Sequence, residues 1–259
     1  MKVVTPHITG ARSPYYDVFT SFYTVETDAG VVLFDCGSFD TDFAAYVQPL
    51  LDARGVTRER LRYVFLSHDH EDHAGGLPAL LDAYPEVTVL SRSEDIQARY
   101  PAVISPENGT RILDVLQVVT IPGHTADSMG LLDTRTGTLL SGDSLQLYGL
   151  FGSGEWGANI VLPTEHRLAL CTLRTLPIEQ VYTAHDYHPY GAEHVGKEAV
   201  QRLLNACEQP LDEIEGLFQQ YPNADDETIR RLYHAAKRRP TLGCHVVTAM
   251  RQAKSRGNS

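Results

Sequence analysis

The sequence lacks the features that place a protein in a membrane or outside the cell. No apolar run approaches the ~18 residues that a membrane-spanning helix needs. The N-terminus lacks the basic region and apolar stretch of a signal peptide. The four cysteines form no C-x-x-C pair, which is typical of free thiols in a reducing compartment, although an even count leaves disulfides open. We therefore expect a cytoplasmic protein without a membrane span.

Basic residues are also scarce, with 22 Lys and Arg against 33 Asp and Glu and a net charge of -11. Such a charge disfavours a polyanionic nucleic acid as the partner. The imbalance is uneven, because residues 221–259 carry +5 and the rest of the chain carries -16. Divalent cations bound to the acidic part would offset some of that excess.

The chain shows no internal repeat and no low-complexity run. Its 259 residues, 42% of them hydrophobic, can bury a large core. We expect a catalytic domain over residues 1–207 and a C-terminal helical extension over residues 208–259, with a boundary near Pro210. Helical patterns in this part cover residues 195–207, 211–221, 225–236 and 241–253. Residues 39–54 also have helical spacing, which Pro49 is expected to kink or break.

Residues 67–76 hold the densest group of chemically active side chains. Three imidazoles and three carboxylates occupy positions 68–73, directly after the apolar run 63–66, which is typical of a buried strand. Charged groups at the end of a buried strand cost free energy unless a cation holds them. Gly75 and Gly76 then allow a tight backbone turn. We interpret this stretch as the first half of a two-metal site.

Three further strand ends supply the same types of ligand. His124 follows a strand-rich run, Asp143 follows residues 138–140, and His185 follows residues 180–184. Imidazole nitrogen and carboxylate oxygen suit Zn²⁺, and also Mn²⁺ or Fe. Seven such side chains suffice for two metal ions that share one carboxylate and keep open positions for water or substrate. The seven candidate ligands are His68, His70, Asp72, His73, His124, Asp143 and His185.

This set of motifs resembles the metallo-β-lactamase superfamily of hydrolases. The family's pattern H-x-H-x-D-H stands at residues 68–73, and its later ligands match His124 in Pro-Gly-His-Thr, Asp143 in Ser-Gly-Asp and His185 in Ala-His-Asp. The order and spacing match over roughly residues 18–190. The resemblance implies an α+β fold, a four-layer αββα sandwich with the metals at one edge of its two sheets.

The resemblance also implies a role for each ligand. One ion would be held by His68, His70 and His124. The other would be held by Asp72, His73 and His185. Asp143 would bridge the two ions. Asp35, at the end of its own strand, resembles the family's acid that orients a ligand imidazole.

Hydrolysis follows from this chemistry. A metal ion lowers the pKa of bound water from ~15.7 toward ~7, so a hydroxide that bridges the two ions can attack a carbonyl carbon without a Ser or Cys nucleophile. Asp72 and Asp143 are the expected catalytic residues, and Asp72 would orient the hydroxide or carry its proton. Candidate substrate contacts are Tyr148, Trp156, Tyr187 and His188, together with the loop 149–159.

Several substrates fit one such site. We favour a small ester, thioester or lactone, because the motif around His124 resembles glyoxalase II-like enzymes and their lactonase relatives. Residues 144–159 contain no Lys or Arg, whereas glyoxalase II carries basic residues after its bridging aspartate to hold glutathione carboxylates. That departure puts specificity for glutathione thioesters in doubt.

The basic tail supports an alternative. It resembles the helical end of lactamase-β-like endoribonucleases, so a phosphodiesterase is the second candidate, but we favour a helical cover on the sandwich or a homodimer contact as the tail's role. A redox protein is disfavoured because His70 stands where flavodiiron proteins place an acid. A sensor on the same fold is disfavoured because no ligand is missing.

Overall fold

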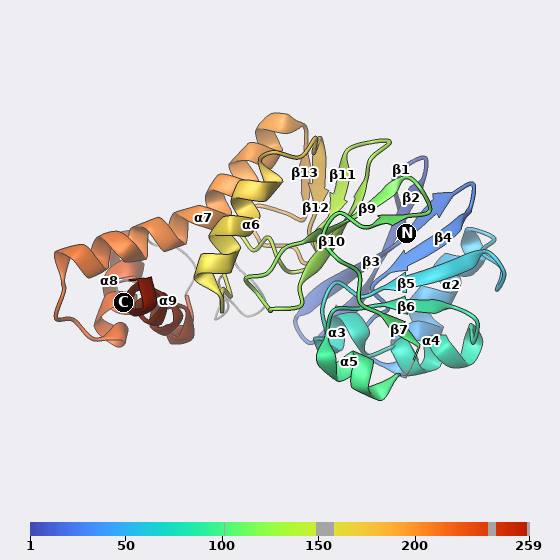
Figure 1. The fold of residues 1–259 in the computed structure, drawn as a ribbon, viewed down its shortest axis with the longest axis horizontal. Helices are drawn as coiled ribbons and strands as arrows, with labels where there is room; N and C mark the ends of the chain where they lie inside the picture. Colours follow the sequence, from blue (N-terminus) through green and yellow to red (C-terminus); the bar gives the residue numbers. More distant parts are fainter. Residues whose placement is uncertain (101, 149–157, 238–241, 258–259) are drawn as a thin grey trace.

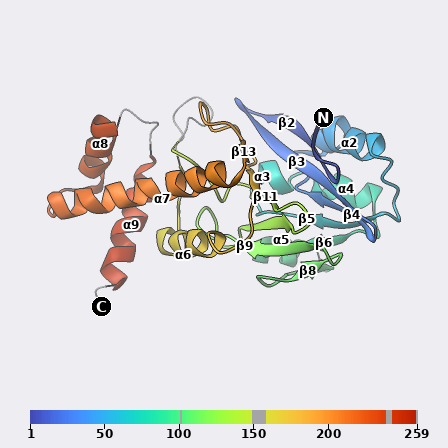
Figure 2. The ribbon, with the colours of Figure 1, turned by 90° about the horizontal axis from the view of Figure 1, so that it is seen from above.

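Two β-sheets packed face to face form the centre of the molecule (Figure 1). The computed structural model describes every residue except 101, 149–157, 238–241 and 258–259. Helices cover the outer face of each sheet, and a cluster of helices extends beyond the second sheet to the C-terminus (Figure 2). This arrangement confirms the expected α+β sandwich with a C-terminal helical extension.

The first sheet has seven strands in sequence order, β1-β2-β3-β4-β5-β6-β7. Strands β1 to β4 pair antiparallel, whereas β4 to β7 pair parallel. Parallel neighbours end at the same edge of the sheet, so the loops after β4 and β5 lie next to each other. The strands are β1 (Lys2–Thr5), β2 (Ile8–Tyr15), β3 (Val18–Thr27), β4 (Gly30–Phe34), β5 (Leu61–Phe65), β6 (Thr88–Leu90) and β7 (Val103–Ile104).

The second sheet has six strands in the order β13-β12-β11-β10-β9-β8. Only β11 and β12 pair parallel. Their two C-terminal ends, which deliver Asp143 and His185, therefore lie at one edge. The strands are β8 (Arg111–Ile112), β9 (Leu116–Thr120), β10 (Met129–Asp133), β11 (Thr138–Leu140), β12 (Gln180–Tyr182) and β13 (Glu193–Val195).

Apolar side chains on both faces of the central strands produce the layers. In β4, Val31 and Leu33 pack against the helices of the first sheet, while Val32 and Phe34 pack against the second sheet. The covering helices are α1 (Asp40–Asp42), η1 (Phe43–Val47), α2 (Gln48–Ala53), α3 (Glu71–Ala74), α4 (Leu77–Ala83) and α5 (Glu94–Arg99). The predicted kink near Pro49 takes the form of a π-helical turn, η1, and Pro49 lies in the first turn of α2.

The C-terminal part differs from the prediction of two separate helices near Pro210. The helices here are α6 (Pro163–Leu173), α7 (Lys197–Gln220), α8 (Asp226–Lys237) and α9 (Cys244–Gly257). Helix α7 runs through Pro210 without ending. A proline inside a helix removes one backbone hydrogen bond, but the buried apolar stripe continues on both sides of it, from Leu203 to Phe218, and holds the helix together.

Helix α7 belongs to two hydrophobic cores. Its first half, with Val200 and Leu204, packs with α6 against the second sheet. Its second half, with Leu211 and Ile214, packs with α8 and α9 in a separate cluster, the tail core. The division into residues 1–207 and 208–259 stays a prediction, because that boundary falls inside one continuous helix.

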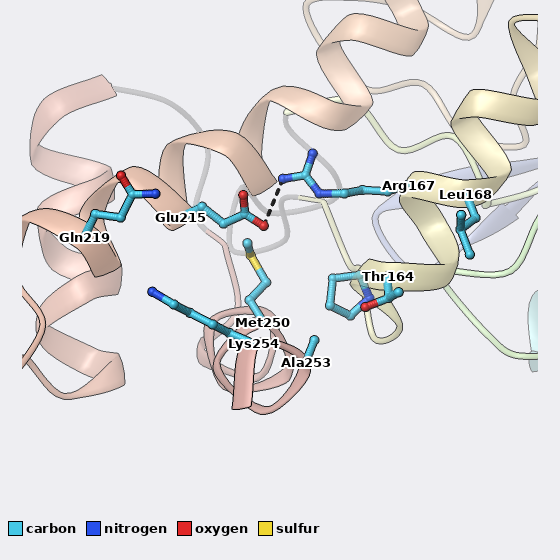
Figure 3. A pocket seen from close by; sticks show the side chains of 9 residues that line it. Thr164, Arg167, Leu168, Glu215, Gln219, Met250, Ala253 and Lys254 are labelled. Carbon is cyan, nitrogen blue, oxygen red and sulfur yellow. Dashed lines mark ion pairs between the residues drawn. The ribbon is translucent and has the colours of Figure 1, made fainter. Parts of the chain in front are cut away.

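Ion pairs join α6 to the second half of α7. The Arg167 guanidinium lies 3.4 Å from Glu208, 2.7 Å from Asp212 and 3.2 Å from Glu215. Beside it, a cavity of about 430 Å³ lies between α6, α7 and α9, with Met250 and Lys254 on its α9 side (Figure 3). One arginine shared by three acids therefore fixes α6 against the extension.

All four cysteines lie in the described part of the chain and carry free thiols, so the disulfides left open by the even count do not form. Among the helices that the structure describes, none is both long enough and apolar enough to cross a bilayer.

We expect Ile214→Ala to destabilise the extension strongly. Ile214 is fully buried in the tail core, and truncating such a side chain removes apolar burial and leaves a cavity. The expected loss in the free energy of unfolding is about 2–5 kcal/mol, measured by urea denaturation. Gln220→Ala, at an exposed position of the same helix, is the control and should cost less than about 0.5 kcal/mol. Equal losses in the two variants would contradict the tail core.

Candidate metal centre

Strand ends from both sheets bring the seven predicted ligands to one edge of the sandwich. His68 follows β5, His124 follows β9, Asp143 follows β11 and His185 follows β12. Asp72 and His73 lie on the short helix α3. Six of the seven side chains are buried, and only His70 is exposed.

Two glycines bring α3 close to the end of β4. A Cβ atom on Gly75 would lie 1.7 Å from the Ser38 carbonyl oxygen, and one on Gly76 would lie 2.2 Å from the Cys36 carbonyl oxygen. Gly75 has helical φ and ψ, so it does not form the tight turn that the sequence predicts. A glycine is needed at this position because the two backbones approach closely. The approach places Asp72 and His73 beside the loop that carries Asp35.

The ligand atoms fall into two outer groups joined by Asp143. The first group consists of His68, His70 and His124, and the second consists of Asp72, His73 and His185. A third group consists of Asp143 with His68 and His73, one residue from each of the other two. Within each group the ligand atoms lie within 4.8 Å of one another. The Asp143 carboxylate lies 3.0 Å from the Nε2 of His185 and 3.7 Å from that of His124. The two outer groups have the members that the resemblance implies for two ions, and the binding of metal by these residues stays a prediction.

Buried polar atoms in the cluster lack hydrogen-bond partners. The Nε2 atoms of His68 and His73 and the Oδ1 atom of Asp143 are buried without a well-formed hydrogen bond. Leaving such atoms unsatisfied costs free energy, and a cation at the centre of the cluster would satisfy them. The donor set of imidazole nitrogens and carboxylate oxygens suits a divalent transition metal. The residues present therefore fit two metal ions.

Most of the ligand imidazoles are held through Nδ1, which leaves Nε2 for the cluster. The Nδ1 contacts are Ser67 Oγ at 3.0 Å for His68, Asp35 Oδ2 at 2.8 Å for His73, the Asn159 carbonyl at 3.1 Å for His124 and the Phe19 carbonyl at 2.8 Å for His185. Such contacts fix the tautomer and the orientation of a metal-binding imidazole.

Asp35 lies where the sequence analysis expects an acid that orients an imidazole. It is fully buried, and besides His73 it accepts hydrogen bonds from the backbone N–H and the hydroxyl of Ser67. Its φ of 59° is left-handed, a conformation that aspartate tolerates better than most residues. On the other side of the cluster, the Thr20 hydroxyl donates to Asp72 Oδ2 at 2.8 Å.

The charges of the two groups differ. Burial lowers the pKa of His124 to about 4, and burial also holds the pKa of His68 well below its usual value, so both imidazoles are neutral near pH 7. Burial by itself would lower the pKa of His185 too, but the carboxylates of Asp143 and Asp72 outweigh it and raise that pKa to about 9. The carboxylates of Asp72, Asp35 and Asp143 likewise outweigh burial and raise the pKa of His73 well above its usual value.

A cavity of about 510 Å³ opens above the ligands. Its lining comprises Tyr15, Tyr16, Asp17, Val18, His70, Glu71, Asp72, His124, Asp143, Gln146, Asn159 and His185. Sequence reasoning missed the β2–β3 turn and Gln146, whereas Asn159 ends the loop 149–159 that it placed near the substrate. Two adjacent tyrosines followed by an aspartate at a strand end were the available signal for that turn. Tyr15 donates its hydroxyl to Glu71 at 3.3 Å.

Among the residues that the structure describes, Tyr148, Tyr187 and His188 are absent from the lining of this cavity, although the sequence predicts them as substrate contacts. Tyr187 is buried in the core between the second sheet and its helices, with its ring 6.2 Å from that of His185. The Tyr148 ring packs 5.2 Å from that of Tyr190, and His188 is exposed. Trp156 and most of the loop 149–159 lie outside the described residues. Packing of the tyrosines against their neighbours explains why they lie away from the described lining.

Curated relatives match about half of the chain. A hydroxyacylglutathione hydrolase from Vibrio parahaemolyticus is 32% identical over 148 residues, which cover 54% of each chain. The same enzyme from Thermosynechococcus vestitus is 32% identical over 145 residues, 54% of this chain and 55% of that one. The chain therefore spans about half the length of these relatives.

Solved structures with the same fold are more distant in sequence. A metallo-beta-lactamase from Cronobacter sakazakii has a TM-score of 0.61 at 16% identity, covering 86% of this chain and 98% of that one. A flavo di-iron protein from Thermotoga maritima has a TM-score of 0.62 at 17% identity, covering 80% and 58%. The family model for the metallo-beta-lactamase superfamily matches residues 15–201, and the chain therefore belongs to this superfamily.

Proposed function

We propose that this chain is a hydrolase that holds two divalent metal ions, Zn²⁺ as the first candidate, and cleaves a small uncharged ester, thioester or lactone. One observation carries the proposal. Two groups of three candidate ligands lie beneath an open cavity, Asp143 groups with one member of each, and the buried Nε2 atoms of His68 and His73 make no well-formed hydrogen bond. The hydroxyacylglutathione hydrolases that match half of the chain support a hydrolytic reaction.

The residues that would hold the ions also prepare the reaction. When bound, the ions supply Lewis acidity, lowering the pKa of a coordinated water from ~15.7 toward ~7 and polarising a carbonyl oxygen. Asp143 lies between the two groups and holds the ligand sets together by charge. Asp72 lines the cavity and is fixed by Thr20, so it is placed to accept a proton from the attacking water. In the metal-free protein, His73 and His185 hold the pKa of Asp72 far below its usual value despite burial, so this carboxylate is ionised and able to bind a cation.

The cavity wall favours a neutral substrate. Its described lining contains Asp17 and Glu71 but no Lys or Arg. The sequence of the adjacent residues 149–157 contains no basic residue either. Tyr15, Tyr16 and Val18 add an apolar edge on the β2–β3 side. An anionic group far from the reacting carbonyl, such as a glutathione carboxylate or an RNA phosphate, would find no basic partner on this wall.

A substrate panel tests the proposal. The zinc-loaded protein should hydrolyse an acyl-homoserine lactone or a neutral thioester at least tenfold faster, by kcat/KM, than S-lactoylglutathione, bis-p-nitrophenyl phosphate or short RNA. Removing the metal with a chelator should abolish the activity, and added Zn²⁺ should restore it. Faster cleavage of the phosphodiester and RNA would instead favour the nuclease alternative, for which the charge of +5 in residues 221–259 is the supporting observation.

Asp143→Ala should lower kcat/KM by more than about 100-fold, because it removes a ligand shared by both groups. Loss of a residue that only hydrogen-bonds to a ligand typically lowers metal affinity or activity by about 10–100-fold, so loss of a ligand should cost more. Circular dichroism should show an intact fold. Asp82→Ala, an exposed aspartate on α4, is the matched control and should turn over like the wild type. Turnover by Asp143→Ala close to that of the control would contradict the mechanism.

Zinc binding should release protons. At pH 7.5 His185, with its pKa of about 9, and His73 both hold a proton in the metal-free protein, and a cation at Nε2 must displace it. Titration calorimetry in buffers of different ionisation enthalpy should give about two ions bound and about three protons released per chain, two from these imidazoles and one from a coordinated water. Raising the pH to 9.5 should reduce the release and increase the apparent affinity. Heats that do not depend on the buffer would contradict these protonation states.

A further inference from the structure

The tail core holds a segment of the metal centre's wall. Ala158 and Ile160 are 1% and 2% exposed, and both belong to the tail core formed with α7, α8 and α9. Asn159, between them, lines the cavity above the ligands. Two buried side chains therefore fix this segment in the tail core, while the residue between them contacts the metal centre through its backbone carbonyl.

Asn159 makes three contacts that connect α9 to His124. Its carbonyl oxygen lies 3.1 Å from His124 Nδ1, and its N–H donates to Gln146 Oε1 at 2.7 Å. Its side-chain oxygen lies 2.5 Å from the Nε2 of His245 on α9. The N–H groups of Val161 and Leu162, two and three residues after Asn159, both donate to the Gly123 carbonyl, at 2.8 and 2.9 Å. The segment is therefore fixed on both sides.

The Asn159 carbonyl decides which His124 nitrogen carries the proton. His124 Nδ1 lies 3.1 Å from this carbonyl and also 3.1 Å from the Gln146 amide nitrogen. If Nδ1 carries the proton, it donates to the carbonyl and Nε2 keeps a lone pair for a cation. If Nδ1 accepts from Gln146 instead, the proton sits on Nε2 and blocks a cation. The Gln146 amide is not free to flip, because its oxygen accepts the Asn159 N–H.

We propose that the C-terminal extension is a positioning element of the metal centre, in which His245 and the tail core hold Asn159 so that its carbonyl keeps the proton of His124 on Nδ1. The inference rests on the two-metal centre of the proposed function. It concerns the first group only, because His124 belongs to it. In the second group, His73 and His185 are held by Asp35 and the Phe19 carbonyl, both outside the extension.

His245→Ala tests this role through metal affinity rather than turnover. Titration of the full-length metal-free protein with Zn²⁺ against a chelating dye gives two dissociation constants. We expect one of them to rise about fivefold to tenfold while the other stays unchanged. The effect should fall at or below the lower end of the 10–100-fold typical of a direct partner of a ligand histidine, because His245 acts through Asn159.

Two further variants address the same contact without deleting His245. Asn159→Ala keeps the backbone carbonyl but removes the oxygen that faces His245, and combined with His245→Ala it should weaken zinc no more than either single change. Gly243→Ala places a Cβ 2.2 Å from the His245 ring and should displace the imidazole with the same result. Gln252→Ala, exposed on the same helix, is the matched control and should leave both constants unchanged.

The outcomes separate this inference from the proposed function. Unchanged zinc constants in His245→Ala would overturn the positioning role, and so would an equal rise in both constants with a lowered melting temperature, which indicates a general loss of stability. Conservative replacement His245→Gln, which retains a donor, should restore the affinity, and failure to restore it would count against the hydrogen bond. A wild-type protein that takes up no zinc would overturn both proposals.

Discussion

The fold depends on one electrostatic constraint. Five imidazoles and two carboxylates lie close together at one edge of the sandwich, all but one of these side chains buried, and a third carboxylate, Asp35, hydrogen-bonds to His73 from behind. Such a group is costly to bury unless its charges and lone pairs are matched. The metal-free protein matches part of them by holding protons on His73 and His185 against Asp72 and Asp143. The Nε2 atom of His68 is left without a hydrogen bond, and a cation would satisfy it.

The constraint explains why the site needs both sheets. Ligands from β5 and α3 and ligands from β9, β11 and β12 reach one point only if the two sheets pack with their strand ends aligned. The apolar layer between the sheets fixes that alignment, with Phe34 and Phe65 of the first sheet in the same core as Leu131 and Leu140 of the second. The same packing presents the β2–β3 turn at the mouth of the cavity. Loss of packing between the sheets would therefore separate the ligands.

The two ligand groups are supported by different parts of the chain. His73 depends on Asp35, which lies at the end of β4 inside the first sheet. His124 depends on Asn159, and the neighbours of Asn159 are buried in the tail core. The helical extension thus reaches the metal centre indirectly, because the His245 side chain and the tail core hold the segment whose backbone carbonyl contacts His124. The charge of +5 in residues 221–259 would favour a nucleic-acid partner. The contacts of the extension, however, connect it through Asn159 to His124.

The sequence by itself determined which residues are candidate ligands, because short motifs after apolar strands carry that information locally, and the resemblance of these motifs to a known family predicted the sandwich. His68 to His73, His124, Asp143 and His185 are recognisable without coordinates, and so is Asp35. Only the tertiary structure decided the rest. Helix α7 continues through Pro210 because an apolar stripe on both sides of it is buried, which a local rule about proline does not capture. Tyr15 and Tyr16 line the cavity while Tyr187 is buried elsewhere, because exposure depends on which elements pack together. Asn159 acts through its carbonyl, an atom that every residue has, so its role is set by position in space and not by residue type.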